Sequence, residues 1–316
     1  MRISGFGMGK NVSKLYYPIV PAIKSILPIV DEYIVALGDS DEDDTTREEI
    51  LSINDPKIKI IDTVWDIERY PRGTEHAHQT DIAMKACSGD WLFYLQSDEV
   101  VHEKYLSTIV NRCKELLDNK EVEGLLFKYR HFWGDYYHYN DSHSWYPHEI
   151  RIVRNYPEIH SWESAQSFRR IPGFDGKNYR QQEGTYKLKV ASVEAYIYHY
   201  GWVRPPKLMQ SKKKSFDTNH NGIKKAAEMY KGQEDYYDYG PLDKTKNFMG
   251  THPEVMKEKI AEFDWADRLR SSGPYPTNRD LMKHERLNYR ILTWIEDTFR
   301  GGKKIGGFNN FELLDV

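Results

Sequence analysis

The chain has 316 residues, enough for one large domain with an extension or for two domains. Its formal net charge of −3 argues against bulk binding of nucleic acid, and no apolar run approaches the roughly 18 residues of a membrane span. The two cysteines, Cys87 and Cys113, fall on apolar faces of predicted helices. This placement indicates buried free thiols and a reducing, cytoplasmic setting.

The N-terminal part alternates between short apolar runs and helical patterns. Arg2 to Phe6, Tyr33 to Leu37 and Lys57 to Asp62 predict three strands, with helices over 21–27 and 46–51 between them. Strands that alternate with helices through short loops are typical of a parallel α/β sheet.

Gly5 to Asn11, GFGMGKN, predicts a glycine-rich loop after the first strand. A P-loop would need a glycine in place of Ser4 and a serine or threonine in place of Asn11. The dinucleotide fingerprint would need a third glycine in place of Lys10, so the sequence disfavours a nicotinamide dehydrogenase. A glycine-rich turn remains a place where a ligand can approach the backbone.

Asp81 to Val101, DIAMKACSGDWLFYLQSDEVV, carries the strongest chemical signal. It begins as a predicted helix that stops at Ser88-Gly89, and Trp91 to Leu95 predicts a buried strand. The polar run Gln96 to Glu99 follows without a gap. Open α/β sheets present ligand-binding groups at such strand ends. The alternative is a solvated turn that caps the next helix, predicted over 102–119.

An acidic loop, 38–45, follows the second strand and lies at the same kind of strand end. Its alternative interpretation is a solvated turn that caps the helix over 46–51. Gly124 to His131 predicts a further strand. The overlapping segment 128–148 is dense in tyrosine, tryptophan and histidine, which indicates either a wall for sugar stacking or a loop packed over the core.

Four segments together resemble the family 2 glycosyltransferases, whose GT-A fold binds nucleotide sugars. The first is the loop with Asn11, and the second is the acidic loop, similar to the family's Gly-Ser-Thr-Asp-Gly-Thr turn. The third, 89–99, resembles the family's GDW…LDADE run with its DxD motif. The fourth, Tyr198 to Arg204 (YHYGWVR), resembles its closing strand end with a histidine. The resemblance covers about residues 1–205.

The resemblance implies a GT-A-like, mostly parallel α/β sheet flanked by helices. We expect residues 1–205 to form the nucleotide-sugar-binding catalytic domain and residues 206–316 to form a helical extension that covers the acceptor side or makes a homodimer contact. Lys212, Lys213 and Lys214 in the extension suit contact with anionic lipid or with the donor diphosphate, or a solvated helix face. The expected location is cytoplasmic, with peripheral contact at the inner membrane face left open.

The implied activity is transfer of a sugar from a nucleoside-diphosphate sugar to a saccharide or glycoconjugate, with inversion and with divalent Mn or Mg as the cofactor. Asp98 matches the second Asp of DxD, and His199 matches the family's later histidine, so both are expected at the metal. The residues expected to bind the donor are Asn11, Asp39, Asp41, Gln79, Gln96 and Asp98.

The sequence departs from the family pattern at two positions. Gln96 replaces the first Asp of DxD and offers the metal no charge. Gln166 lies near the expected catalytic base and cannot accept a proton, so Glu163 is the first candidate base and Glu149 the second. Arg151 and Arg154 suit contact with diphosphate or acceptor, or surface ion pairs.

Two further functions stay open, whereas the dehydrogenase is disfavoured as described above. One is a non-catalytic nucleotide-sugar-binding protein of the same fold, which Gln96 and Gln166 would allow. The other is a sugar-1-phosphate nucleotidyltransferase, which would need an arginine in the first loop, where the sequence has Lys10.

Overall fold

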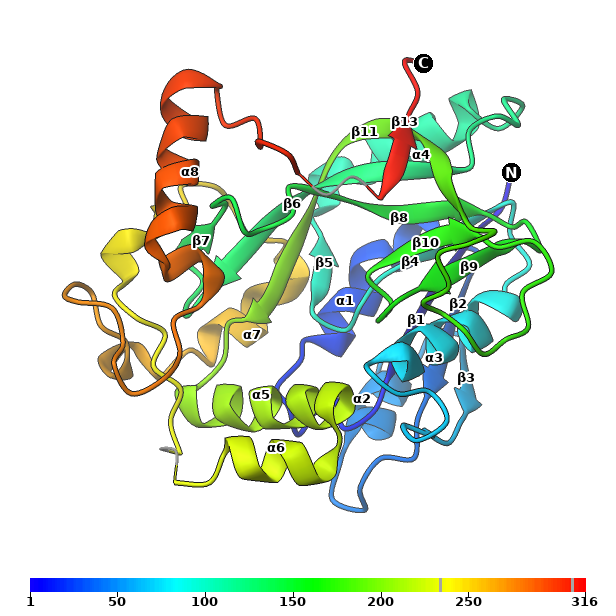
Figure 1. The fold of residues 1–316 in the computed structure, drawn as a ribbon. Coiled ribbons are helices and arrows are strands. Elements are labelled where there is room, and N and C mark those ends of the chain that lie inside the picture. The colour runs from blue at the N-terminus through cyan, green and yellow to red at the C-terminus, as the bar shows by residue number, and fades with distance from the viewer. Residues whose placement is uncertain (233–234, 308–309) are drawn as a thin grey trace.

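The computed structural model describes residues 1–232, 235–307 and 310–316. Within these ranges one mixed sheet has the strand order β3-β2-β1-β4-β8-β6-β11-β10-β9 (Figure 1). In chain order these strands are β1 (Ile3–Gly9), β2 (Glu32–Leu37), β3 (Ile58–Asp62), β4 (Trp91–Tyr94), β6 (Gly124–Trp133), β8 (His148–Arg154), β9 (Ile159–Trp162), β10 (Ser167–Arg170) and β11 (Tyr186–Trp202).

The first four strands of this order are mutually parallel, and β6 and β11 are parallel to each other. Strand β8 runs antiparallel between β4 and β6. Helices lie on both faces of the sheet and a helical segment follows it, so the predicted α/β class is confirmed. The arrangement agrees with the GT-A-like fold that the sequence motifs imply.

The predicted loop at Gly5 to Asn11 is wrong from Gly5 to Gly9, because β1 continues to Gly9. Gly7 and Gly9 pair with Val35 and Leu37 of β2. A Cβ on Gly7 would lie 2.7 Å from the carbonyl oxygen of Leu95. Gly7 therefore permits close packing of backbone inside the sheet, and it does not form a turn.

Helices cover the two faces through separate hydrophobic cores. Ile23, Ile50 and Ile109 come from helices on one face, and Ala83 and Met84 from the helix on the other. Helix α3 (Thr74–Lys85) begins before Asp81, so the predicted helix start was too late. The helices of the sheet region are α1 (Ile19–Ile26), α2 (Thr46–Ser52), α3 (Thr74–Lys85) and α4 (Leu106–Glu115).

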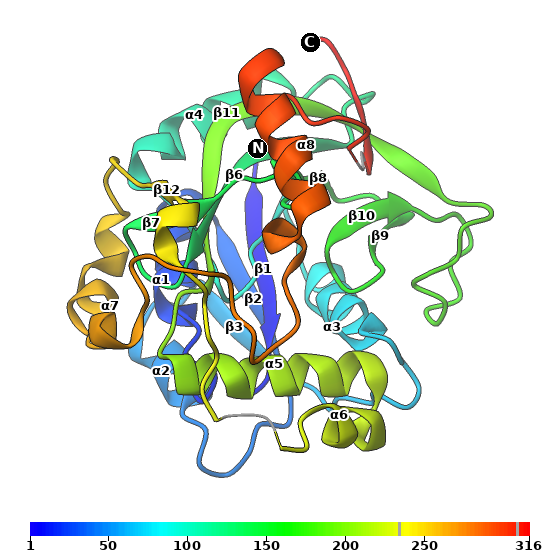
Figure 2. The same cartoon turned by 60° about the vertical axis from the view of Figure 1, so that its left-hand side comes forward.

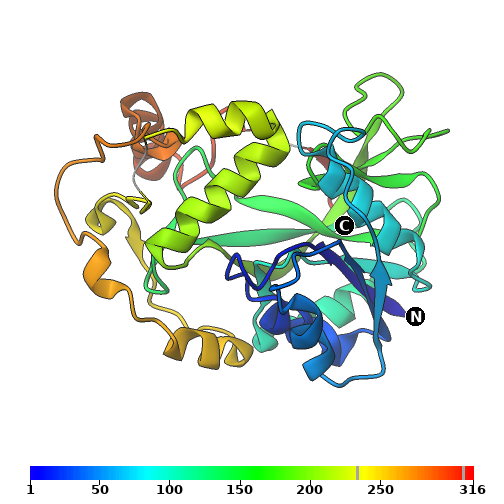
Figure 3. The same cartoon turned by 90° about the horizontal axis from the view of Figure 1, so that it is seen from below.

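After β11 the described chain contains four α-helices, α5 to α8, and long segments outside α-helices separate α6 from α7 and α7 from α8. Helix α5 lies across the end toward which β1 points (Figure 2), and seen from below α5 and α6 lie in front of the sheet (Figure 3). The division at residue 205 stays a prediction. The remaining elements are α5 (Pro206–Asn221), α6 (Ile223–Met229), α7 (Lys257–Ala261), α8 (Leu287–Phe299), β5 (Glu99–Val101), β7 (His138–Asn140), β12 (Lys246–Asn247) and β13 (Phe311–Leu313).

The last strand, β13, returns to the sheet and pairs in parallel with β11. Cys87 and Cys113 are buried free thiols, as predicted. No helix in the described ranges is long and apolar enough to cross a membrane.

Candidate functional site

A cavity of about 690 Å³, here called the first cavity, lies where β1, β4 and β11 end, beneath α5. This volume is within the usual range for small-molecule sites. Four of the donor-binding and metal-binding residues predicted from the sequence line this cavity. Helix α5 contributes further lining residues. The lining includes Asn11, Gln96, Asp98, His199, Trp202, Lys212, Phe216 and His220.

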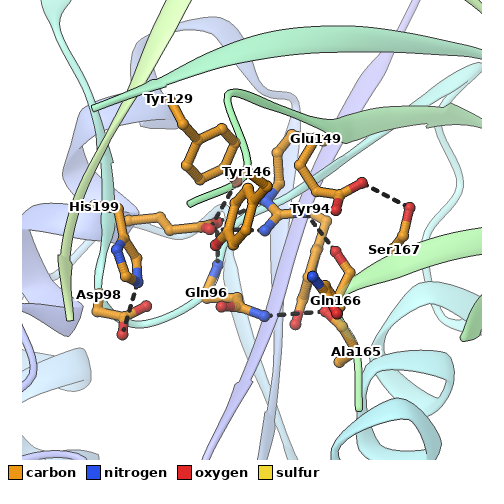
Figure 4. A network of polar contacts seen from close by, with 12 residues as sticks. Tyr94, Gln96, Asp98, Tyr129, Tyr146, Glu149, Ala165, Gln166, Ser167 and His199 are labelled. Atoms are coloured by element: carbon orange, nitrogen blue, oxygen red, sulfur yellow. Dashed lines mark hydrogen bonds and ion pairs between the residues drawn. The ribbon is translucent and has the colours of Figure 1, made fainter. Parts of the chain in front are cut away.

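Backbone pairing brings Asp98 and His199 together although they are far apart in sequence. Strand β5 pairs antiparallel with β11, with Glu99 opposite His199, and Tyr200 N donates to Asp98 O at 2.8 Å. His199 Nε2 lies 3.6 Å from Asp98 Oδ2, which is longer than a hydrogen bond. Both side chains are largely buried and face each other (Figure 4).

The electrostatic environment keeps Asp98 ionised. Burial alone would raise its pKa, but His199, Lys212 and Arg204 together hold the pKa of this carboxyl well below its usual range. Lys212 Nζ lies 4.0 Å from Asp98 Oδ2 and donates to Gly201 O at 2.5 Å. Burial and the neighbouring Arg204 lower the pKa of Lys212 to about 7.

A hydrogen-bond chain behind His199 fixes the ring protons. His131 Nε2 lies 2.8 Å from the carbonyl oxygen of Tyr146, which can only accept, so this nitrogen donates. Burial and His199 hold the pKa of His131 well below its usual range, so His131 is neutral and its Nδ1 accepts. His199 Nδ1 donates to it at 3.1 Å. This leaves His199 Nε2 directed at Asp98, the arrangement typical of a metal-binding histidine.

These two residues fit a divalent cation as part of its ligand set. A carboxylate and an imidazole are ligands that Mn²⁺ accepts, and substrate phosphates usually complete such sites. A Cβ on Gly201 would lie 2.5 Å from Asp98 Oδ2 and 2.6 Å from His199 Nε2, so glycine leaves the space between them open. The described residues contain no group of three or more His, Cys, Asp or Glu that could hold a metal without such a substrate.

Gln96 lines the first cavity and also anchors the turn between β9 and β10. Its Nε2 donates to Ala165 O at 3.0 Å. Arg151 Nη1 donates to Gln166 O at 3.2 Å, which holds the same turn from the other side. Both Glu163 and Ala165 have positive φ, so this turn is held in a strained conformation.

Neither expected base lines the first cavity. Glu149 is buried and accepts from Ser167 Oγ at 2.8 Å, at the far end of the polar network from Asp98 (Figure 4). Burial raises the pKa of Glu149 to about 7. Glu163 is half-buried, and its neighbour Ser164 reaches the cavity.

The acidic loop lies at the rim of the first cavity and is engaged in ion pairs. Asp39 accepts from Lys10 Nζ and Asp41 from Lys14 Nζ, each at 2.8 Å. Asn11 has a positive φ, and its Oδ1 accepts from Asp41 N at 2.8 Å. Asn11 thus ties the loop to the end of β1, whereas the two carboxylates are not among the lining residues.

Gln79 and the two arginines have buried structural partners. Gln79 is fully buried and donates to Glu75 Oε1 at 2.7 Å. Arg151 is paired with Glu99, and Arg154 donates to backbone carbonyls of Leu116, Asn119 and Val122. Neither interpretation given above for the arginines holds, because both are buried and neither lines the first cavity.

Sequence reasoning missed His131 and Gly201. His131 lies in a segment so rich in aromatic residues that nothing marked it. Gly201 did carry a signal, because a glycine two residues after a candidate ligand at a strand end indicates close approach. Lys212 was considered for the diphosphate, and the structure places it beside Asp98.

No family model and no curated protein sequence matches this chain. Solved structures do match. S. aureus TarS 1–349 in complex with UDP is 15% identical over 69% of this chain and 65% of that chain, with a TM-score of 0.40. The same protein in complex with UDP-GlcNAc is 14% identical over 69% of this chain and 66% of that chain, with a TM-score of 0.39.

Glucosyl-3-phosphoglycerate synthase from Mycobacterium tuberculosis, in complex with Mn²⁺, UDP and phosphoglyceric acid, is 22% identical. The match covers 42% of this chain and 43% of that chain, with a TM-score of 0.28. This chain thus spans less than two thirds of the length of TarS 1–349 and of the synthase.

Proposed function

We propose that this protein transfers a sugar from a nucleoside-diphosphate sugar to a saccharide or glycoconjugate acceptor. The observation that carries the proposal is the meeting of Asp98 and His199 in a nucleotide-sized cavity at the ends of parallel strands. The UDP complexes of the solved structures described above are in line with a nucleotide donor, and the Mn²⁺ complex with a divalent cofactor.

The departing diphosphate gains negative charge, and cations must stabilise it. Lys212 lines the cavity and is held by Gly201 O and Asp98, so it is positioned to contact a diphosphate. Asp98 and His199 would hold the divalent ion, which supplies further positive charge to the leaving group. Asn11 and Gln96 offer amide groups to the nucleoside or ribose at the same wall.

One observation favours a second candidate, a non-catalytic nucleotide-sugar-binding protein. Glu149 and Glu163 do not line the cavity, and the acidic lining residues in the described ranges are Asp98 and Asp217. Of these two, Asp217 already accepts a hydrogen bond from Tyr230 OH, at 2.5 Å from its Oδ2. An inverting transferase needs a base at the acceptor hydroxyl, so the assignment of that base decides between the two functions.

The deciding experiment is a thermal-shift panel of UDP, GDP, CMP and dTDP sugars with and without Mn²⁺, followed by donor hydrolysis assays. Ligands that bind the folded state raise its melting temperature. We expect one nucleotide class to stabilise the protein more strongly with Mn²⁺ and to be hydrolysed slowly. Stabilisation without hydrolysis or transfer to any acceptor would support the binding protein, and no stabilisation by any donor would refute both.

A further inference from the structure

A second cavity, of about 580 Å³, lies on the other side of the wall that bounds the first. Trp145 and Tyr146 line both cavities. The second cavity is lined by residues of β6 and β11, by the segment 141–148, by Lys246 of β12, by Asp297 of α8 and by the chain that follows α8. His143 joins these parts, since its Nδ1 lies 2.6 Å from Glu296 Oε1.

The charged lining of the second cavity is mainly positive, because four of its charged residues are cations and two are carboxylates. Lys246 is 3.0 Å from Asp141 and 3.2 Å from Asp297, and both carboxylates are therefore engaged by it. The lining cations are Lys128, Arg130, Lys246 and Lys304, and the carboxylates are Asp141 and Asp297.

Arg130 differs from the other cations of this lining. Lys128 pairs with Glu194 at 2.5 Å and Lys304 lies 3.4 Å from Glu296. The Arg130 guanidinium has no hydrogen bond or ion pair within the described ranges. It is held between aromatic rings, with its Cζ 4.2 Å from the centroid of Tyr139 and 5.2 Å from that of Tyr196.

Rings that hold the faces of a guanidinium leave its N–H edge free for a planar anion. Arg130 is half-buried and lines the second cavity, so a ligand there can reach its unpaired N–H groups. The lining therefore offers a preformed two-donor site for a carboxylate or a phosphate group.

The rest of the lining suits a ring-shaped ligand larger than an ion. Tyr129, Trp145, Tyr146 and Tyr196 contribute aromatic surface. Trp145 Nε1 is buried without a hydrogen-bond partner, so it is a free donor in the shared wall. Aromatic surface with a few convergent polar groups is typical of a small-molecule site.

We propose that the second cavity binds an acidic saccharide, with Arg130 pairing with its carboxylate or phosphate and the aromatic residues packing on its ring. The aromatic lining is the reason to propose a saccharide, and Arg130 is the reason to propose that the saccharide is acidic. Neither part depends on the transfer reaction proposed for the first cavity.

The test is calorimetric titration of the full chain with tri-galacturonate, glucose 6-phosphate, maltotriose and inorganic phosphate. We expect saturable binding of at least one of the two acidic sugars, and which one binds tells carboxylate from phosphate. Arg130→Gln should weaken that binding about tenfold or more. The matched control is Arg69→Gln, because Arg69 stacks on Tyr70 at 5.4 Å outside both cavities. The control should bind as the native protein does.

Several results would overturn the proposal. These are equal binding of the acidic sugar by R130Q and the native protein, binding of maltotriose as tight as that of the acidic sugars, or binding of inorganic phosphate as tight as that of a sugar phosphate. Absence of binding by both acidic sugars would do the same. Donor stabilisation in the thermal-shift panel should persist in R130Q, so failure of this proposal is distinguishable from failure of the transferase proposal.

Discussion

Arg151 donates two hydrogen bonds of 2.7 Å to the carboxylate of Glu99, the residue that follows Asp98. Tyr129 OH donates a third, also at 2.7 Å. Both charged side chains are almost completely buried. This ion pair anchors the chain immediately after the candidate metal ligand, so its integrity should matter for the position of Asp98.

Arg151→Met should destabilise the protein by about 3–5 kcal/mol, because it leaves the buried Glu99 carboxylate without its counter-charge. The double variant E99L/R151M removes both charges and should recover part of the loss. Urea unfolding measures both free energies. A single variant as stable as the native protein, or a double variant less stable than R151M, would contradict the structural role of the pair.

Asp98→Asn should abolish the part of donor binding that depends on Mn²⁺. The change keeps the volume of the side chain and removes the charge that pairs with the cation. We expect titrations of the best-binding UDP, GDP, CMP or dTDP sugar to lose at least tenfold in affinity with Mn²⁺ and little without it. Asp62→Asn serves as control, because Asp62 pairs with Arg47 at the surface. Unchanged Mn²⁺ dependence in D98N would remove Asp98 from the ligand role.

Gly201→Ala should lower Mn²⁺-supported donor binding at least tenfold while the protein stays folded. The new methyl group would lie 2.5 Å from Asp98 Oδ2 and 2.6 Å from His199 Nε2, so these groups would have to separate. Gly307→Ala is the control, since its Cβ would meet Lys304 at an ordinary 3.4 Å. Circular dichroism checks that G201A is folded. Native-like donor binding by G201A would show that the open space between Asp98 and His199 is not required.

Glu149→Gln should make the protein more stable than the native chain at pH 8.5 and no more stable at pH 4.5. The pKa of buried Glu149 is raised from 4.5 to about 7, so the folded state binds its proton more tightly than the unfolded state. Native stability therefore falls as pH rises from 4.5 to 7, by about 3 kcal/mol, and stays lower above that. E149Q has no carboxyl group at this position, so its free energy of unfolding should not show this decrease between pH 4.5 and 7.

Urea unfolding at both pH values measures the difference for E149Q, with Glu163→Gln on the neighbouring hairpin as control. A parallel pH dependence in E149Q and the native protein would show that Glu149 is ionised in the fold.

The strands predicted over 33–37, 57–62 and 124–131 lie within one or two residues of the observed bounds, because apolar runs with short loops have few other solutions. The end of β1 was not predictable, because Gly7 and Gly9 look like a turn in the sequence, and the Leu95 backbone that packs against Gly7 is remote in sequence. Asp98 and His199 were found because Asp98 follows a strand of recognisable sequence and His199 lies near the end of another.

The partners of the buried charges were not predictable. The pairing of Glu99 with Arg151, and the contact of His131 with His199, depend on which strands lie adjacent in the sheet. No local pattern carries that information, because the residues are 52 and 68 positions apart. The same holds for Glu149, whose place behind the β9–β10 hairpin depends on tertiary packing.

The pairing of β13 with β11 has a consequence for how the protein is made. Leu188 to Val190 receive Phe311 to Leu313 as a neighbour, and Leu314 N donates to Val190 O at 2.8 Å. On the ribosome, the strand that carries the histidine is synthesised more than a hundred residues before this neighbour emerges. The segment Leu188 to Val190 therefore gains this neighbour only after residues 311–314 have been synthesised.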